Sequence, residues 1–70
     1  MTGDTAFDIQ SALEAYKLPK GYRWVSFSFD GKSVIGILAH GLEDPAYEQV
    51  VCKDVSHAAK LVGAAVTALG

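Results

Sequence analysis

The pair of residues with the most reactive chemistry in this sequence is Cys52 and His57, which stand five positions apart. A nucleophilic cysteine needs an adjacent base, a third group that orients the base, and an oxyanion hole. Cys52 lies in an apolar segment that we predict to be a strand, where a cysteine outside a disulfide usually behaves as a small buried hydrophobe. His57 lies in the predicted first turn of a helix, whose positive end disfavours an imidazolium. We therefore interpret Cys52 as structural and expect no catalysis by this pair.

A second group, His40 with Glu43 and Asp44, offers imidazole and carboxylate ligands for a metal ion. Acidic side chains in such a loop more often make hydrogen bonds within turns, so we expect a solvated loop here. The sequence contains neither the phosphate-binding string G-x-x-x-x-G-K-[ST] nor G-x-G-x-x-G. These observations predict a protein that is not an enzyme and that holds no metal and no cofactor.

The composition of the chain indicates which classes of binding partner, such as nucleic acids or membranes, are not expected. The chain has 70 residues, and six Lys and Arg against eight Asp and Glu give a net charge of −2. Nucleic-acid binding depends on clustered Lys and Arg, and these residues are scattered here, so we do not expect it. The first ten residues lack the basic segment of a signal peptide, and the apolar stretch at 61–70 is shorter than the ~20 residues of a spanning helix. With a single cysteine, this indicates a cytoplasmic protein without a membrane partner.

Helices are predicted at both ends of the sequence. Thr5 with Asp8 resembles a capping box, and the Pro-Gly break at 18–21 ends the first helix. Asp54 or Ser56 is expected to cap the last helix. The faces that we expect to be buried are two apolar stripes at helical spacing: Ala6, Ile9, Leu13 and Tyr16 in the first helix, and Ala58, Leu61, Val62, Ala65, Val66 and Leu69 in the last.

Three strands are predicted between the helices, at 22–29, 33–39 and 47–53, and Asp30-Gly31 is a strong hairpin signal between the first two. The order is therefore α-β-β-β-α. We expect a single α+β domain over residues 1–70, in which both helices pack on one face of a three-stranded antiparallel sheet.

This order and length resemble the double-stranded-RNA-binding domain. Members of that family grip phosphates with a basic cluster that opens the last helix. The corresponding segment here, 54–60, reads DVSHAAK, in which Lys60 alone matches in kind. The resemblance is therefore one of topology and carries no inference of RNA binding.

The pairing of the hairpin decides which side chains face the helices. A two-residue loop at Asp30-Gly31 places Phe27 opposite Val34. A three-residue loop ending at Gly31 places Trp24 opposite Gly36, where the indole lies over a residue without a side chain, and we prefer it slightly. In that register one face gathers the residues that we expect to form the core side of the hairpin: Val25, Phe27, Ile35 and Ile37.

Two surfaces are candidates for binding. The first is the sheet face opposite that core side, with the residues Tyr22, Trp24, Val34 and Leu38. Aromatic residues on an uncovered face are typical anchors of a binding patch, and a twisted third strand or a second copy of the chain is the alternative cover. The second surface is a row of small residues in the last helix, Ala59, Gly63 and Thr67, which permits close approach of the first helix or of a second copy.

From these features we expect a small non-enzymatic protein-interaction module. We expect it to be a homodimer that acts as an inhibitor or adaptor on a larger protein, in the way of phage-type proteins that block host machinery. A domain of this length buries only roughly 60% of its unfolded surface, so self-association would help to stabilise it. The alternative is a small-ligand binder for a nucleotide or metabolite, in which Tyr22, Trp24 and Tyr47 stack on a ring and Arg23 or Lys60 binds an anion.

Overall fold

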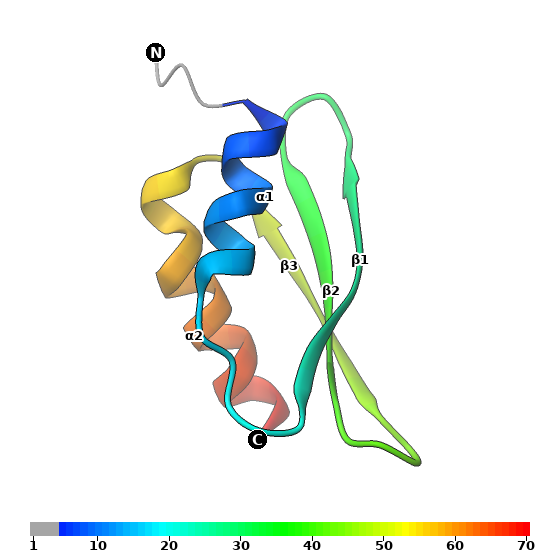
Figure 1. Cartoon of the computed structure of the whole chain (residues 1–70). Helices are drawn as coiled ribbons and strands as arrows, with labels where there is room; N and C mark the ends of the chain where they lie inside the picture. The colour runs from blue at the N-terminus through cyan, green and yellow to red at the C-terminus, as the bar shows by residue number, and fades with distance from the viewer. Residues whose placement is uncertain (1–4) are drawn as a thin grey trace.

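The computed structural model describes residues 5–70, which form a three-stranded antiparallel sheet with two α-helices on one of its faces (Figure 1). The α+β class and the order α-β-β-β-α predicted from the sequence are confirmed. Neighbouring strands pair in the order β1-β2-β3, so β2 is central and β1 and β3 are the two edges. The elements are α1 (Ala6–Ala15), β1 (Tyr22–Phe29), β2 (Val34–His40), β3 (Ala46–Cys52), a 3₁₀ helix η1 (Val55–His57) and α2 (Ala58–Leu69).

Side-chain caps begin both helical segments. The Thr5 hydroxyl accepts a hydrogen bond from the Asp8 N–H at 3.1 Å, and the Asp8 carboxylate accepts one from the Thr5 N–H at 3.2 Å. This is the predicted capping box, which satisfies two backbone donors of the first turn. Of the two residues expected to cap the last helix, Asp54 caps the 3₁₀ helix η1 that leads into it: its Oδ1 accepts from the His57 N–H at 3.2 Å. The helix α2 itself begins after His57 without a side-chain cap.

The hairpin between β1 and β2 has a four-residue loop, so both predicted registers are wrong. Phe29 pairs with Val34, and Asp30 holds the loop between them. Its Oδ1 accepts from the backbone N–H groups of Lys32 at 2.9 Å and Ser33 at 2.7 Å, while Gly31 has a φ of 93°. The Asp30 carboxylate thus accepts hydrogen bonds from two backbone N–H groups of the loop, and in this way it stabilises the longer turn.

A β-bulge then changes the alternation of side chains along β1. Trp24 pairs with Leu38 and Ser26 pairs with Ile37, so Val25 is the extra residue. Tyr22 and Trp24 lie on the face that the helices cover, and beyond the bulge Phe27 lies on that same face. Strict alternation puts Trp24 and Phe27 on opposite faces, which is why the sequence pattern misleads here.

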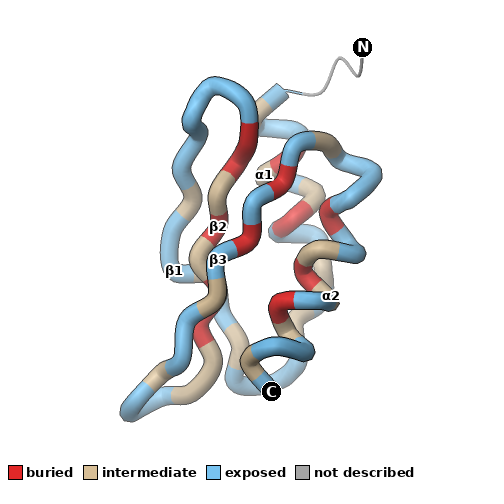
Figure 2. Tube along the Cα trace, turned by 180° about the vertical axis from the view of Figure 1, so that it is seen from behind, coloured by how far each residue is buried: buried red, intermediate tan, exposed pale blue. Residues whose placement is uncertain are grey.

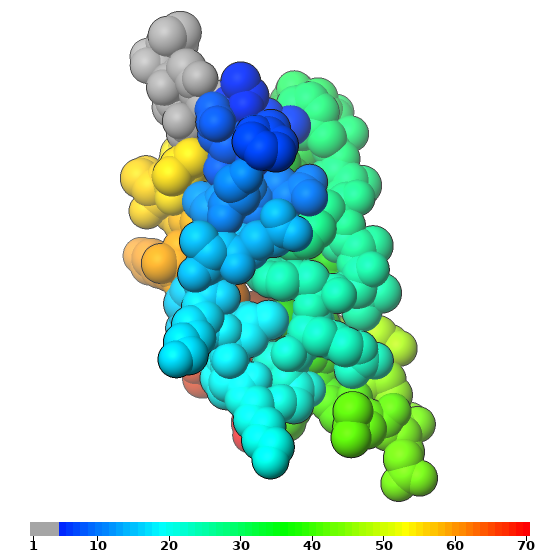
Figure 3. All heavy atoms as spheres, viewed as in Figure 1, coloured from blue at the N-terminus to red at the C-terminus, as the bar shows by residue number. Residues whose placement is uncertain are grey.

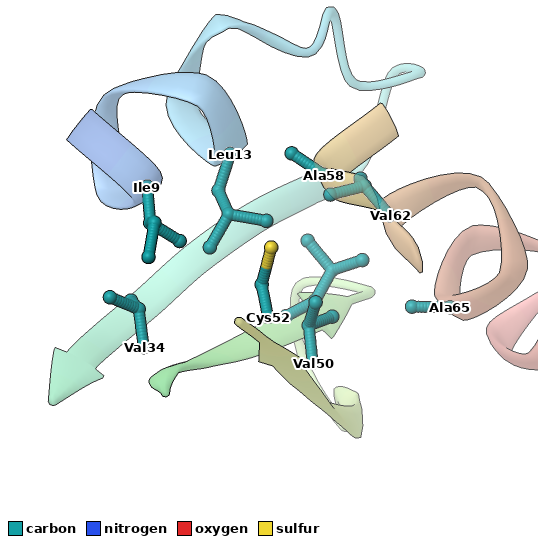
Figure 4. Packing of buried hydrophobic residues seen from close by; sticks show 9 residues of the cluster. Ile9, Leu13, Val34, Val50, Cys52, Ala58, Val62 and Ala65 are labelled. Atoms are coloured by element: carbon teal, nitrogen blue, oxygen red, sulfur yellow. The ribbon is translucent and has the colours of Figure 1, made fainter. Parts of the chain in front are cut away.

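The core lies between this sheet face and the two helices (Figure 4). Both predicted helix stripes are confirmed, because every member is buried or half-buried. Val34 and Leu38 are 1% and 0% exposed, so their predicted place on an uncovered face is wrong. The buried hydrophobic residues are Ile9, Leu13, Val34, Leu38, Ala39, Val50, Cys52, Ala58, Val62 and Ala65.

The opposite sheet face is uncovered and contains most of the side chains that we predicted for the core. Ile35 and Ile37 lie on it half-buried, and Val25 is 52% exposed. Of the predicted core side, Phe27 alone packs against the core. Figure 2 views the chain from behind and shows β1 mostly exposed beside a β2 that is buried or half-buried along its length. Because of the four-residue loop and the bulge, the residues expected in the core lie on the uncovered face, apart from Phe27, and the residues expected on the uncovered face lie against the helices.

Candidate protein interface

The residues with reactive chemistry, Cys52 and His57, are joined through Asp54 rather than to each other. Cys52 is fully buried, and its Sγ donates a hydrogen bond to the Asp54 carbonyl oxygen at 3.0 Å. The exposed His57 places Nδ1 2.9 Å from Asp54 Oδ1. The hydroxyl of Ser56 donates to the same oxygen at 2.6 Å, and this bond, with the nearby His57, lowers the pKa of Asp54. The arrangement is a helix cap, in which the imidazole is directed to a carboxylate and not to the thiol.

The loop that contains the other predicted ligand group presents its two acids to solvent. Glu43 and Asp44 are exposed, whereas the His40 ring stacks on Tyr22 with centroids 4.0 Å apart. In the described part of the chain, no group of three or more His, Cys, Asp or Glu side chains could hold a metal ion. Among the helices of residues 5–70, none has the length and apolar character needed to cross a bilayer.

The structure brings the four predicted partner-binding residues together, but on the helix-covered face. Tyr22 donates its hydroxyl hydrogen to the Val66 carbonyl oxygen at 3.3 Å, which ties β1 to α2. The Trp24 ring packs against the Phe27 ring, with centroids 4.9 Å apart. Val34 and Leu38 are members of the buried core cluster. Val34 and Leu38 lack the exposed surface that contact with a partner requires, and the half-buried Tyr22 and Trp24 pack against the core.

The three small residues of the predicted row in α2 differ in how far they are buried. Gly63 is half-buried, and a Cβ there would lie 3.5 Å from the Tyr16 hydroxyl, so the glycine faces the end of α1. Ala59 and Thr67 are exposed, and the Thr67 hydroxyl donates to the Gly63 carbonyl oxygen at 3.0 Å. Contact of this row with a second copy stays a prediction.

Sequence reasoning expected an uncovered sheet face, but it missed the side chains that this face carries. Its centre is the pair Ile35 and Ile37 of β2. Across the sheet, Ile35 lies between Ser28 and Val51, and Ile37 lies between Ser26 and Gln49. Tyr47 and Val51 of β3 add 57% and 39% exposed side chains to it. The strand residues of this face include no carboxylate: the patch is apolar at its centre and flanked by small and neutral polar groups, and Arg23 lies at one end of it, paired with Ala39.

The free edge of β3 borders a pocket with cationic walls. The pocket has a volume of about 260 Å³ and is lined by residues at the end of β3 and in η1 and α2: Val51, Lys53, His57, Lys60 and Leu61. Val51 and Leu61 supply apolar surface, and the other three residues supply two ammonium groups and an imidazole. Asp54 is the acid beside them, and it is engaged with Ser56 and His57.

The other end of β3 is acidic. The β2–β3 loop contains Glu43 and Asp44 and projects beyond the helices, away from the end at which β3 leads into η1 (Figure 1). In Figure 3 the same loop stands out from the body of the molecule at the lower right. The edge strand therefore runs from an acidic loop to a basic pocket.

Comparison of the chain with protein-family models, with curated proteins and with solved structures gave no match. The function is accordingly argued from the geometry of the sheet face and of the β3 edge.

Proposed function

We propose that this chain is a small, non-enzymatic protein-interaction module that forms a homodimer and docks on a larger protein through the uncovered face of its sheet. The observation that carries the proposal is the position of Ile35 and Ile37, two large aliphatic side chains in the central strand on the face without helices. Contiguous apolar patches of this kind mark protein-binding surfaces in small soluble domains. An inhibitor or adaptor would act by occupying a partner's surface with this face.

The small core supports self-association. Several of its buried positions are occupied by short side chains, namely Cys52, Ala58 and Ala65. A domain of this size buries a modest share of its surface, and association with a second copy is one of the ways to add buried area. A stable dimer removes about 800 Å² from each copy, a substantial part of the 4596 Å² that this chain exposes.

The experiment compares two apolar-to-polar substitutions of exposed or half-exposed residues. Ile37→Ser changes the sheet face, and Phe7→Ser changes an exposed residue of α1 that is 77% exposed. Both variants should keep the parent's circular dichroism spectrum. We expect Ile37→Ser to lose capture of the larger protein from the native host, while Phe7→Ser and the parent retain the same captured protein. Equal capture by all three proteins would show that the sheet face is not the docking surface.

A small-ligand binder is the second candidate, and the pocket beside β3 is the observation in its favour. Lys60, expected to bind an anion, lies in this pocket with Lys53 and His57. This pocket differs from the expected aromatic one, because among residues 5–70 no Tyr, Trp or Phe lines it. At about 260 Å³ the pocket is below the roughly 300–1,000 Å³ of typical ligand sites. It fits a small carboxylate or phosphate with a short apolar body better than a nucleotide.

A thermal-shift screen separates the two candidates. A ligand present at 100 times its dissociation constant stabilises the folded state by about 2.7 kcal/mol, which raises the melting temperature of a domain this small by about 10 °C or more. A small carboxylate or phosphate that gives this shift in the parent but not in Lys60→Ala would favour the ligand-binding candidate. The absence of any shift across such compounds favours the protein-interaction module.

A further inference from the structure

The two edges of the sheet differ in how they resist pairing with another strand. β1 contains the bulge at Val25, a device that twists an edge and interrupts its ladder. β3 pairs with β2 in one unbroken register over all seven of its residues, from Ala46 to Cys52, with no bulge and no proline inside the strand. Every second residue of such an edge directs its N–H and C=O away from the sheet. Within residues 5–70 no further strand pairs with that side of β3.

The charges at the two ends of β3 are complementary to each other. Lys53 and Lys60 are exposed at the end that leads into α2, and Glu43 and Asp44 are exposed at the end that leaves the β2–β3 loop. An antiparallel neighbour reverses the direction of the strand. A second copy paired along this edge therefore brings its acidic end to the basic end of the first, and its basic end to the acidic end.

We propose that a second copy of this chain adds to the sheet through β3, antiparallel to β3 of the first copy and centred on Gln49. This proposal rests on the homodimer of the proposed function and names its interface. A two-fold axis through Gln49 pairs all seven residues of the strand and joins two three-stranded sheets into one continuous sheet. The helices of both copies then lie on the same side, and the uncovered faces join into one wider face for the larger partner.

The register makes two kinds of contact. On the uncovered face, Tyr47 of each copy lies opposite Val51 of the other, an aromatic and a β-branched residue that stabilise antiparallel pairs. At the ends, Lys53 of each copy lies opposite Pro45 of the other, one position from Asp44. The pocket beside β3, with Lys60 on its wall, is where the acidic loop of the second copy arrives. Each contact occurs twice because the dimer is symmetric.

Charge reversal tests the pairing. One variant combines Lys53→Glu with Lys60→Glu, and a second combines Glu43→Lys with Asp44→Lys; all four side chains are exposed, so both variants should fold as the parent does by circular dichroism. Each variant alone opposes like charges at both ends of β3. We expect its dimer dissociation constant in sedimentation equilibrium to rise by about 100-fold.

An equimolar mixture of the two variants is the decisive sample. In a mixed dimer both ends again oppose unlike charges, so we expect a dimer with the parent's affinity. If both variants remain dimers alone, or if the mixture stays monomeric, the β3 pairing is wrong and the homodimer uses another surface. If the parent itself is monomeric at all concentrations tested, the homodimer of the proposed function fails together with this inference.

A cross-link tests the centre of the register. Gln49→Cys places two copies of the new thiol opposite each other, where Cα atoms about 4.5–5.5 Å apart suit a disulfide. The native Cys52 is fully buried and should not compete. Mild oxidation should give a covalent dimer within minutes for Gln49→Cys and not for the control Ser26→Cys, an exposed position in β1. Equal cross-linking of the two variants, or none, would overturn the Gln49-centred register.

Discussion

The indole of Trp24 lies so close to Gly36 that a Cβ on residue 36 would be 2.6 Å from a carbon of the ring. Phe27 approaches the same position to 3.0 Å. The absence of a side chain at Gly36 thus lets two aromatic rings from β1 lie across the central strand. The predicted contact of the indole with this glycine is confirmed, although Trp24 pairs with Leu38 and not with Gly36.

Gly36→Ala should therefore destabilise the protein. The added methyl group overlaps rings that are held between the sheet and the helices, and overpacking of this kind costs about 1–3 kcal/mol. Gly63→Ala is the matched control, because its methyl group meets only the Tyr16 hydroxyl at an ordinary 3.5 Å. In the interior of α2 the same substitution should stabilise by about 1 kcal/mol. Urea unfolding measures both, and a Gly36→Ala variant at least as stable as the parent would show that the room above Gly36 is not needed.

Gly31→Val should also destabilise the protein, for a conformational reason alone. Gly31 has a φ of 93°, which a β-branched residue resists, and a Cβ on this residue would have no heavy atom within 4 Å. We expect a loss of about 1–2 kcal/mol in the free energy of unfolding. Lys32→Val is the control, since Lys32 is exposed and contributes its backbone N–H to the loop. Equal melting temperatures of the two variants would show that the positive φ of residue 31 does not cause the loss of stability.

The secondary structure could be predicted because its signals are local. The capping box of Thr5 and Asp8 and the apolar stripe of α2 depend on residues within one or two turns. The faces of the hairpin could not be predicted from alternation. The carboxylate of Asp30 accepts from two backbone donors and lengthens the loop, and the extra residue Val25 reverses the alternation, yet no residue type marks it as a bulge. The uncovered face was therefore expected, but with the wrong side chains.

Cys52 should react with a thiol reagent only after the protein is denatured. It is fully buried and its sulfur points from β3 toward the helices (Figure 4), and reagents attack the accessible thiolate. Ser28→Cys provides the comparison, because this exposed position in β1 should be labelled at once in the native protein while Cys52 is not. Rapid labelling of native parent protein would contradict the buried position of Cys52.

Stability should fall as the pH is lowered through the titration of Asp30. Hydrogen bonds from the backbone N–H groups of Lys32 and Ser33 lower the pKa of Asp30 from its ordinary value of 3.8. A carboxyl whose pKa is lower in the folded state contributes stability that is fully present above its unfolded pKa, and this contribution is lost as the pH falls through the folded pKa. Asp30→Asn keeps an acceptor oxygen without the charge. We expect the free energy of unfolding in urea to depend less on pH in this variant than in the parent between about pH 5 and about pH 3. An equal dependence of the free energy of unfolding on pH in Asp30→Asn and in the parent would contradict the prediction.

Trp24→Ala should be strongly destabilised, in contrast to Ile37→Ser on the opposite face. The indole is half-buried and packs against the core and Phe27, so its removal should cost about 3 kcal/mol, a large part of the stability of a small domain. Trp24→Phe should cost much less. It keeps a ring over Gly36 and removes an indole N–H that is buried and has no acceptor among residues 5–70. Urea unfolding followed by circular dichroism gives the order, with Trp24→Ala least stable and Trp24→Phe close to the parent. A Trp24→Ala variant as stable as the parent would mean that the ring lies outside the core. The helices would then cover the other face of the sheet.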